Sequence, residues 1–475
     1  MGNDNEYFDD EEFREILNEY EEAVKSGQTV FMDADDLADI ADYYQLNNRF
    51  EEAKQAMERA MELEPDSVVA LDYKVREALT FKDYEAAEEY LDLMGDDQLP
   101  EYIYCRAEIW IAQGMVEKAD RYLRMWLKEV TEDEYQDYIY DVVNLWAEYD
   151  NHQKALEWMM RANPEESETF MELMGRIYFG AGDYYKAEST FNQLIDMDPF
   201  QKRYWKALAN AQYMKEDYSA AVTSSEYAIA IDPEDTEALL AKANALYRLD
   251  NFEEALKFYE RCSEKDPSEF TMLYQGSCLV ALRSYNQALD WLKEAERIAP
   301  SDSPYLAEIY QELSFVYCEL KMFDMALQYI DKTDALACDH ADMMVIRGHI
   351  LLASNRVDEA TDTFKRAIRA SHYSPKIVMR VAVSVYDNHY LEMAYRLFRK
   401  YLNLSDFSID SLCTDGYSYM ALCCYDLMLN DDWLIYLQIA CERNPQEAKQ
   451  VLGHLFPKEL QPKQYLEYAK KHLTE

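Results

Sequence analysis

The sequence predicts an all-α protein built from repeated helical hairpins. Only 11 Gly and 12 Pro occur among the 475 residues, which is too few for the many turns of a β architecture. Apolar residues recur at the spacing of one helix face, i, i+3, i+4 and i+7. The pattern itself returns about every 34 residues. We therefore expect an array of helix pairs that stack on one another.

Two independent series of residues mark this period. Prolines lie 33 to 35 residues apart, with one interval of 64 that spans two periods, at Pro65, Pro100, Pro164, Pro199, Pro233, Pro267 and Pro300. The alanine of an aromatic-x-x-Ala pattern recurs every 32 to 38 residues, at Ala53, Ala87, Ala119, Ala155, Ala187, Ala221, Ala255, Ala288, Ala326, Ala360 and Ala394. The agreement predicts twelve copies that begin near residues 34, 68, 100, 136, 168, 202, 236, 269, 307, 341, 375 and 414.

Residues 168–201 show how one copy is built. Apolar residues line one face of each half: Met171, Met174, Gly175 and Tyr178, then Tyr184, Ala187, Phe191 and Leu194. Between the halves, Gly182 supplies a turn and Asp183 stands where an N-cap belongs. Pro199 closes the second half, because the residue before a proline avoids the helical region. Gly175 and Ala187 are small, so we expect the two helices to cross closely there.

This pattern resembles the tetratricopeptide repeat, whose signature joins W-x2-L-G-x2-Y to A-x3-F, A and P. Matching residues are Trp205, Leu208, Ala209, Ala221, Ala228 and Pro233 in one copy, Leu37, Ile40, Ala41, Tyr44, Ala53, Ala60 and Pro65 in another, and Gly348, Ala360, Phe364 and Ala367 in a third. The resemblance implies a right-handed superhelical α-solenoid of about twelve hairpins with helical caps. The chain is also similar to acidic cytosolic multi-repeat proteins of gut-type bacteria.

Some copies depart from the pattern. The second has Lys74 and Val75 where Leu and Gly are expected. The twelfth has Trp433 in place of Ala, which should push its helices apart or mark a local interface. Residues 403–413 are extra, and we expect a hinge there.

The predicted organisation has three parts. Residues 1–33 form an acidic N-terminal capping helix, and residues 34–406 form the solenoid of copies one to eleven. Residues 407–475 hold the twelfth copy and the C-terminal capping helices. Such caps cover the terminal faces of a solenoid.

The charge of the chain excludes several classes of partner. There are 93 Asp and Glu against 47 Lys and Arg, a formal charge of −46. That field repels nucleic acid and anionic membranes. The 49% hydrophobic content excludes disorder over most of the length. Because the sequence shows neither a signal-like N-terminus nor a run of about 18 apolar residues, we expect a cytoplasmic protein without a membrane partner.

No motif indicates catalysis, a metal or a cofactor, and we expect none of the three. The nine cysteines form no C-x-x-C pair and are typical of core thiols in a reducing compartment. Asp33, Asp35, Asp36 and Asp39 do not make an EF-hand, because Ala38 and Tyr44 stand where Gly and Glu are required. We interpret these acids as favouring a helix N-terminus. His349 and His389 are interpreted as structural.

The resemblance implies that the first helix of each hairpin lines a concave surface. There, copies one, three, four and nine present acids: Asp35, Asp39, Asp42, Glu101, Glu108, Asp137, Asp141, Glu148, Glu308, Glu312 and Glu319. Copies five to seven instead present what we call the basic island: Arg176, Arg203, Lys206, Asn210, Tyr213, Asn244, Tyr247 and Arg248. Copy eleven presents a smaller set, Lys376, Met379, Arg380 and Tyr386.

The basic island suits an extended peptide. Asparagine pairs with both sides of a peptide group, and Arg or Lys binds a carboxylate. Lys206 and Asn210 match half of the clamp with which some family members hold chaperone C-termini. Ala241, Phe270 and Tyr274 occupy the other half, so that ligand is not predicted. An acidic peptide or another C-terminal carboxylate is expected, unless these cations only balance neighbouring acids.

The sequence thus supports two hypotheses for function. The first is a non-catalytic scaffold or adaptor that binds a protein segment in the concave groove. The alternative is a self-associating assembly subunit that uses exposed apolar surface on its terminal repeats. The oligomeric state and the identity of the partner stay open.

Overall fold

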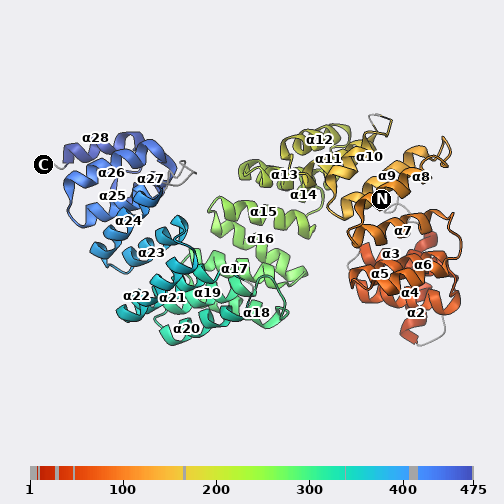
Figure 1. Ribbon diagram of the computed structural model, residues 1–475, viewed down its shortest axis with the longest axis horizontal. Helices are drawn as coiled ribbons and strands as arrows, with labels where there is room; N and C mark the ends of the chain where they lie inside the picture. Colours follow the sequence, from red (N-terminus) through yellow and green to blue (C-terminus); the bar gives the residue numbers. More distant parts are fainter. Residues whose placement is uncertain are drawn as a thin grey trace. The chain divides into compact units, whose positions relative to one another are not determined.

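The protein is an array of α-helical hairpins in a computed structural model that describes residues 8, 11–26, 32–46, 49–163, 167–336, 338–405 and 416–472. Short turns join the helices, and no strand occurs among the described residues (Figure 1). The predicted all-α repeat fold is confirmed. The chain divides into two compact units, Met1–Pro233 and Glu234–Glu475. This division cuts through the predicted solenoid of 34–406, whose boundaries stay a prediction.

The first unit begins with α2 (Glu11–Ser26) and continues with six hairpins. The hairpins are α3 (Ala34–Leu46) with α4 (Phe50–Leu63), α5 (Val68–Thr80) with α6 (Tyr84–Leu93), α7 (Pro100–Ala112) with α8 (Val116–Trp126), α9 (Tyr135–Glu148) with α10 (His152–Met159), α11 (Glu168–Gly180) with α12 (Tyr184–Met197), and α13 (Lys202–Met214) with α14 (Tyr218–Ile231). The two helices of each hairpin pack on each other. The first helices begin at, or within one residue of, the positions that the sequence predicts.

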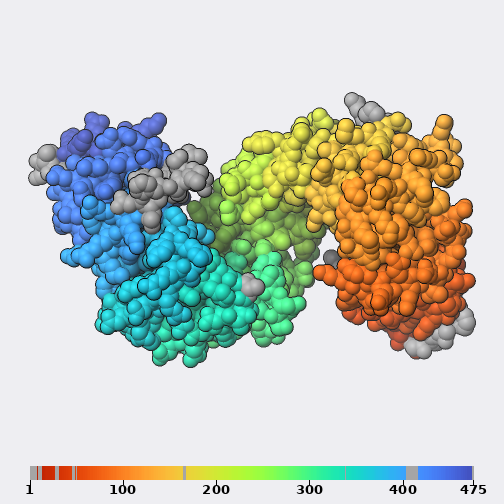
Figure 2. All heavy atoms as spheres, viewed as in Figure 1, coloured from red at the N-terminus to blue at the C-terminus, as the bar shows by residue number. Residues whose placement is uncertain are grey.

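The second unit holds six further hairpins and a C-terminal segment. They are α15 (Thr236–Arg248) with α16 (Phe252–Lys265), α17 (Glu269–Ala281) with α18 (Tyr285–Ile298), α19 (Leu306–Glu319) with α20 (Phe323–Lys332), α21 (His340–Ala353) with α22 (Val357–Ala370), α23 (Pro375–Asp387) with α24 (Leu391–Ser405), α25 (Tyr417–Asp426) with α26 (Asn430–Arg443), and then α27 (Pro445–Leu452) and α28 (Pro462–His472). In Figure 2 the colours of this unit follow one another in chain order from green to blue, since each hairpin packs on its neighbours. Residues 406–413 of the predicted hinge lie outside the described residues.

In several hairpins, a glycine on the first helix leaves room for a large side chain of the second helix. A Cβ added at Gly175 would lie 2.7 Å from the ring of Phe191, and one added at Gly348 would lie 2.3 Å from that of Phe364. Gly276 faces Leu292 in the same way, at 2.6 Å. These contacts explain why the helices cross where the sequence has glycine, as expected for Gly175.

From the second hairpin to the twelfth, the turn inside each hairpin holds one residue in the left-handed region. Glycine fills this position at Gly114 and Gly182, with φ of 78° and 76°. Elsewhere a side-chain-bearing residue adopts the same conformation, for example Glu216 (φ 63°) and Lys321 (φ 61°). Non-glycine residues in this region are strained, so the repeat tolerates strain at a fixed point of its turn.

Hydrogen bonds about one period apart tie neighbouring hairpins together. Within the first unit, the hydroxyl of Tyr104 donates to Asp141 at 3.0 Å. Within the second, Ser303 donates to Glu269 at 3.2 Å. Tyr104 and Asp141 belong to successive first helices, and Ser303 lies just before α19, so each bond links neighbouring repeats.

The ends of the array bury aromatic side chains. Phe13 and Tyr20 of α2 are buried, and Phe13 lies 5.5 Å from Tyr43 of α3 between ring centroids. At the other end, Trp433 is buried and stacks on Phe456 at 6.4 Å. Trp433 does not separate its hairpin, since α25 and α26 stay packed; it marks the contact with the C-terminal segment.

Individual predictions about local chemistry can be placed in this fold. Asp33 accepts a hydrogen bond from the backbone N–H of Asp36 at 2.9 Å, which is the helix-start role interpreted for this acidic run. In the irregular second copy, Val75 is buried and Lys74 pairs with Glu77 at 2.6 Å. Among the described residues, no helix has the length and apolar character needed to cross a membrane.

Candidate functional site

The basic island is divided between the two units. Arg176, Arg203, Lys206, Asn210 and Tyr213 belong to the first unit, and Asn244, Tyr247 and Arg248 belong to the second. The two groups are therefore separate candidates.

A pocket of about 480 Å³ in the first unit brings two of the predicted residues together. It is formed by the first helices α9, α11 and α13, with contributions from α10 and α12. Its lining residues are Ala147, Asp150, His152, Arg176, Phe179, Gly180, Tyr184, Phe191, Ala207 and Asn210. We call it the Arg176 pocket. It combines the guanidinium of Arg176 and the carboxamide of Asn210 with the carboxylate of Asp150, the imidazole of His152 and aromatic walls.

Two close contacts shape the Arg176 pocket. Gly180 ends α11 against the imidazole of His152, where an added Cβ would come within 2.1 Å of the ring. Phe191 forms part of the wall because Gly175 leaves room for its ring. The rings of Phe179 and Tyr184 meet edge to face, with 5.6 Å between centroids. The repeat's own packing positions therefore build the apolar side of the pocket.

Arg176 is the exposed cation of this pocket. Its guanidinium donates to the side-chain oxygen of Asn144, on α9, at 3.2 Å. Among the described residues, no carboxylate lies within ion-pair distance of it. A neutral amide leaves the positive charge uncompensated, so Arg176 keeps its capacity to bind a ligand carboxylate.

Arg203 lies in a different electrostatic setting. Its guanidinium lies 3.1 Å from Glu168 and 3.2 Å from Glu172, both on α11. It also donates to the hydroxyl of Tyr204 at 2.8 Å, and Tyr204 donates to Glu168. Two neighbouring acids therefore balance the charge of Arg203.

Lys206, Asn210 and Tyr213 follow Arg203 along α13. Lys206 is half-buried and Asn210 is exposed. Tyr213 packs edge to face on Tyr218, with 5.3 Å between ring centroids. Of these three residues, Asn210 alone lines the Arg176 pocket.

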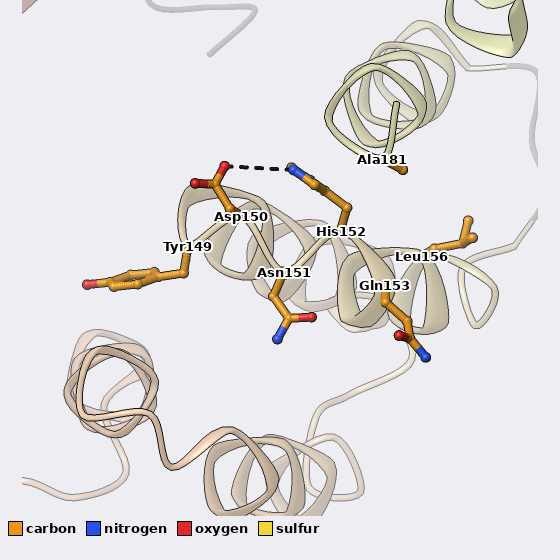
Figure 3. A pocket seen from close by; sticks show the side chains of 7 residues that line it. All are labelled: Tyr149, Asp150, Asn151, His152, Gln153, Leu156 and Ala181. Carbon is orange, nitrogen blue, oxygen red and sulfur yellow. Dashed lines mark ion pairs between the residues drawn. The ribbon is translucent and has the colours of Figure 1, made fainter. Parts of the chain in front are cut away.

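Two further residues of the pocket, Asp150 and His152, were not predicted from the sequence. They lie at the turn into α10, where Asp150 has φ of 54° and the Nε2 of His152 is 3.7 Å from its carboxylate (Figure 3). The other ring nitrogen, Nδ1, is buried and has no hydrogen bond among the described residues. A second hollow of about 560 Å³ lies at this turn, between Tyr149 and Ala181. No motif marks these residues; the signal is the contact with Gly180.

The island residues of the second unit are engaged in packing. The hydroxyl of Tyr259 donates to the side-chain oxygen of Asn244 at 2.7 Å. Tyr247 packs edge to face on Phe252 at 5.4 Å and on Tyr274 at 5.3 Å. Arg248 is exposed at the end of α15.

The smaller basic set of copy eleven pairs with an acid one repeat earlier. Arg380 lies 2.6 Å from Asp342, and Lys376 lies 3.8 Å from the same oxygen. Tyr386 donates to Asp426 of α25. These cations are thus compensated, as Arg203 is.

The part of the chain that the structure describes offers no group of residues suited to metal binding or to thiol chemistry. It holds no cluster of three or more His, Cys, Asp or Glu side chains arranged for a metal ion. Most described cysteines are buried, and burial raises the pKa of the Cys262 thiol to about 11. Such a thiol is a poor nucleophile at neutral pH.

Three segments of the sequence match known families. Residues 37–67 and 173–236 match the family described as Tetratricopeptide repeat. Residues 214–295 match the family described as Anaphase-promoting complex, cyclosome, subunit 3. No curated protein matches the sequence.

The chain is also similar, at low identity, to several solved structures. Yeast Tom70 is 16% identical, covers 93% of this chain and 96% of its own, and has a TM-score of 0.44. YrrB, titled a TPR protein with an unusual peptide-binding site, is 18% identical over 38% of this chain and 91% of its own, with a TM-score of 0.32. The APC/C hetero-tetramer Cut9-Hcn1 is 12% identical over 96% and 95%, with a TM-score of 0.36. The family matches at residues 37–67 and 173–236, together with the hairpins found there, identify tetratricopeptide repeats in this chain.

Proposed function

We propose that the protein is a scaffold that binds an extended peptide of a partner protein in the Arg176 pocket. A tetratricopeptide-repeat fold supports a role in protein–protein interaction. The observation that carries the proposal is that Arg176 and Asn210, from neighbouring first helices, line one pocket with aromatic walls. Pockets of this kind combine apolar walls with a few placed polar groups.

Each part of the pocket has a place in this proposal. Arg176 binds a carboxylate, either the C-terminus or an acidic side chain, because only a neutral amide contacts it now. Asn210 pairs with a peptide group of the ligand. An apolar ligand side chain packs between Phe179 and Tyr184.

The remaining predicted residues have lesser roles. Arg203, Lys206 and Tyr213 lie on α13 beside the pocket. They contribute to the electrostatic potential at the pocket and to its rim. Arg203 contributes least to carboxylate binding, because Glu168 and Glu172 already hold its guanidinium. Asn244, Tyr247 and Arg248 are not part of this pocket.

Matched peptide pools test the proposal. Acetylated octapeptides rich in Leu, Val, Tyr and Ser are made with either a free or an amidated C-terminus, and fluorescence polarisation measures their binding to the full chain. The free-carboxylate pool should bind about tenfold tighter, as a charge-assisted hydrogen bond contributes roughly 1.5 to 3 kcal/mol. Arg176→Gln should remove that preference.

Arg297→Gln is the matched control. Arg297 is an exposed arginine of the second unit that pairs with Glu294 at 2.5 Å, so its loss changes net charge equally. The preference should persist in this variant. Equal binding of the two pools to the wild type, or a preference that survives Arg176→Gln, would contradict the proposal.

A second candidate function is self-association through the twelfth hairpin. At its turn Met428 is 82% exposed, and on α26 Ile435 is 55% exposed. Large apolar side chains at the surface are typical of interaction sites when they gather. Light scattering of wild type and of Met428→Ser/Ile435→Ser tests it: a dimer lost in the variant supports this function, and a monomer at every concentration removes it.

A further inference from the structure

First helices of the second unit, from α17 to α25, and α27 line an open cavity to which the proposed function gives no role. Its volume is about 680 Å³, within the range of ligand pockets. Much of its wall is apolar: Phe315 of α19, Val345 and Ile346 of α21, and Met379 and Val383 of α23. Phe315 is 38% exposed, and its ring meets that of Tyr285 edge to face, with 6.5 Å between centroids. We call this the Glu312 cavity.

Three carboxyl groups from different helices reach the Glu312 cavity. Glu312 comes from α19, Asp387 from α23 and Glu447 from α27. Among the described residues, no Lys or Arg lies within ion-pair distance of Glu312 or Asp387. Glu447 accepts the backbone N–H of Gly416 at 2.8 Å through one oxygen, while the other, Oε2, is buried without a hydrogen bond.

The cations and imidazole at the cavity do not offset these acids. Arg380 lines it, but its guanidinium is held by Asp342 at 2.6 Å. His349 shares Nδ1 with the hydroxyl of Ser384 and the amide of Asn388, each at 3.1 Å. Burial lowers the pKa of His349, so this imidazole is neutral at physiological pH.

Burial has a measurable effect on the acids. It raises the pKa of Glu312 to about 7, with the carboxylate of Glu308 adding to the shift. Burial raises the pKa of Asp387 as well. Ionised carboxylates in such a place are destabilised by desolvation, and a bound cation relieves that destabilisation.

We propose that the Glu312 cavity binds a lysine side chain of an extended partner segment, with apolar side chains of that segment packed against Phe315 and Met379. The aliphatic stem of lysine can lie along an apolar wall while its ammonium meets the carboxyl groups. Lysine fits better than arginine because its three donors can serve three acceptors from separate helices, whereas a guanidinium favours one bidentate carboxylate. This site is independent of the Arg176 pocket, which lies in the other unit and prefers the opposite charge.

The test uses peptides without terminal charges, so that the Arg176 pocket has no carboxylate to bind. Octapeptide pools, acetylated and amidated, carry Lys, norleucine or Arg at the centre among Leu, Val, Tyr and Ser. Fluorescence polarisation at pH 8 with the full chain should give at least tenfold tighter binding of the Lys pool than of the norleucine pool. Glu312→Gln/Asp387→Asn should abolish the difference.

Two further variants separate binding from folding and from bulk charge. Glu264→Gln/Asp290→Asn removes two exposed carboxylates from α16 and α18, the second helices of their hairpins, and should keep the tenfold preference. Val383→Lys places a tethered ammonium at the cavity. It should weaken binding of the Lys pool until that pool binds no tighter than the norleucine pool. Circular dichroism verifies that each variant is helical.

The pH dependence adds a signature that a structural role would not give. Binding of the Lys pool should weaken as pH falls from 8 to 6, by up to about tenfold per pH unit below 7, because Glu312 then takes up a proton. Protonation of His349 acts in the same direction. Tyr247, Glu308, Arg380, Asp387 and Glu447 are the other groups around Glu312, and Glu312→Gln should flatten the profile.

Several results would overturn the inference. Equal binding of Lys and norleucine pools excludes a cation site, and tighter binding of the Arg pool excludes lysine as its ligand. If Glu264→Gln/Asp290→Asn loses the preference for the Lys pool as fully as Glu312→Gln/Asp387→Asn does, the preference is an effect of bulk charge. If light scattering finds a dimer that Glu312→Gln/Asp387→Asn dissolves, the occupant is a second copy of this chain.

Discussion

The Arg176 pocket and the Glu312 cavity are built alike and charged oppositely. Both lie on first helices of consecutive hairpins, and both have an arginine near an acid of the preceding repeat. In the first unit, Glu168 and Glu172 compensate Arg203 and leave Arg176 beside a neutral amide. In the second, Asp342 compensates Arg380, and the carboxyl groups of Glu312 and Asp387 have no ion-pair partner among the described residues. The difference teaches that periodic positions build the hairpin, while the few uncompensated charges on it determine the ligand.

The largest expected effect comes from removing a buried aromatic ring that packs on the first helix of its own hairpin. Phe191 and Phe364 are buried and face a glycine of their own hairpin. Phe191→Ala or Phe364→Ala should lower the free energy of unfolding by about 3 to 5 kcal/mol. Because repeats couple mainly to their neighbours, hydrogen exchange should rise most around the altered hairpin. Phe81→Ala, at a ring that is 74% exposed, is the control and should change little. A loss below about 1 kcal/mol at either buried ring contradicts the shared construction.

The next effect separates the sites by pH. The pKa of Glu312 is about 7 in the folded chain against an ordinary value of 4.5, so the folded state holds this proton more tightly than the unfolded state. Stability from this group is therefore lost as pH rises from about 4.5 to 7. Glu312→Gln should raise the free energy of unfolding at pH 8 by about 1 to 3 kcal/mol and should change it far less at pH 5. Urea titrations at both pH values measure this, with Glu264→Gln as control. An equal gain at the two pH values would show that ionisation is not the cause.

A smaller effect distinguishes the two arginines of the first unit. Arg203→Gln removes the arginine from Glu168 and Glu172, although Glu168 keeps the hydroxyl of Tyr204, and should cost about 1 to 2 kcal/mol. Arg176→Gln removes one exposed contact to an amide and should cost less than about 0.5 kcal/mol. Urea titrations of both variants make the comparison. If Arg176→Gln is the more damaging, its role is structural and the pocket loses its cation.

The smallest effect tests whether the turns of the two units are strained in the same way. Glu216 and Lys321 hold the same left-handed turn position, in the first and second unit respectively. Replacing either by Gly should raise stability by about 0.5 to 1 kcal/mol, since the strain of the side chain outweighs the entropy that glycine adds to the unfolded state. The converse change, Gly182→Ala, should lower stability. Thermal unfolding measures all three, and a loss of stability in both glycine variants would show that these turns are not strained.

The sequence predicted the hairpins because proline, alanine and helical spacing all report on local packing. The first helix beginning at Glu168 starts where the pattern places it, and Gly175 meets Phe191 as its size suggests. Irregular copies were harder to judge. Trp433 could separate its helices or mark a contact, and only packing against Phe456 decides between the two.

The site was predicted less completely because charge compensation acts between repeats. Arg203 looked available for a ligand when its own helix was considered, yet Glu168 lies one period earlier on a parallel position. Comparing the charges of each first helix with those of the first helix one repeat earlier would have revealed that pair. Asp150 and His152 carry no such signal, since their place at the pocket follows from the close approach of His152 to Gly180.

The most direct test of the account is a crossed binding experiment with two probes and two variants. The free-carboxylate pool and the capped Lys pool are each titrated against wild type, Arg176→Gln and Glu312→Gln/Asp387→Asn. The account predicts that Arg176→Gln weakens only the carboxylate pool and that Glu312→Gln/Asp387→Asn weakens only the Lys pool, each by about tenfold. If one variant weakens both pools equally, or neither variant discriminates between them, uncompensated charge on the first helices does not determine what this protein binds.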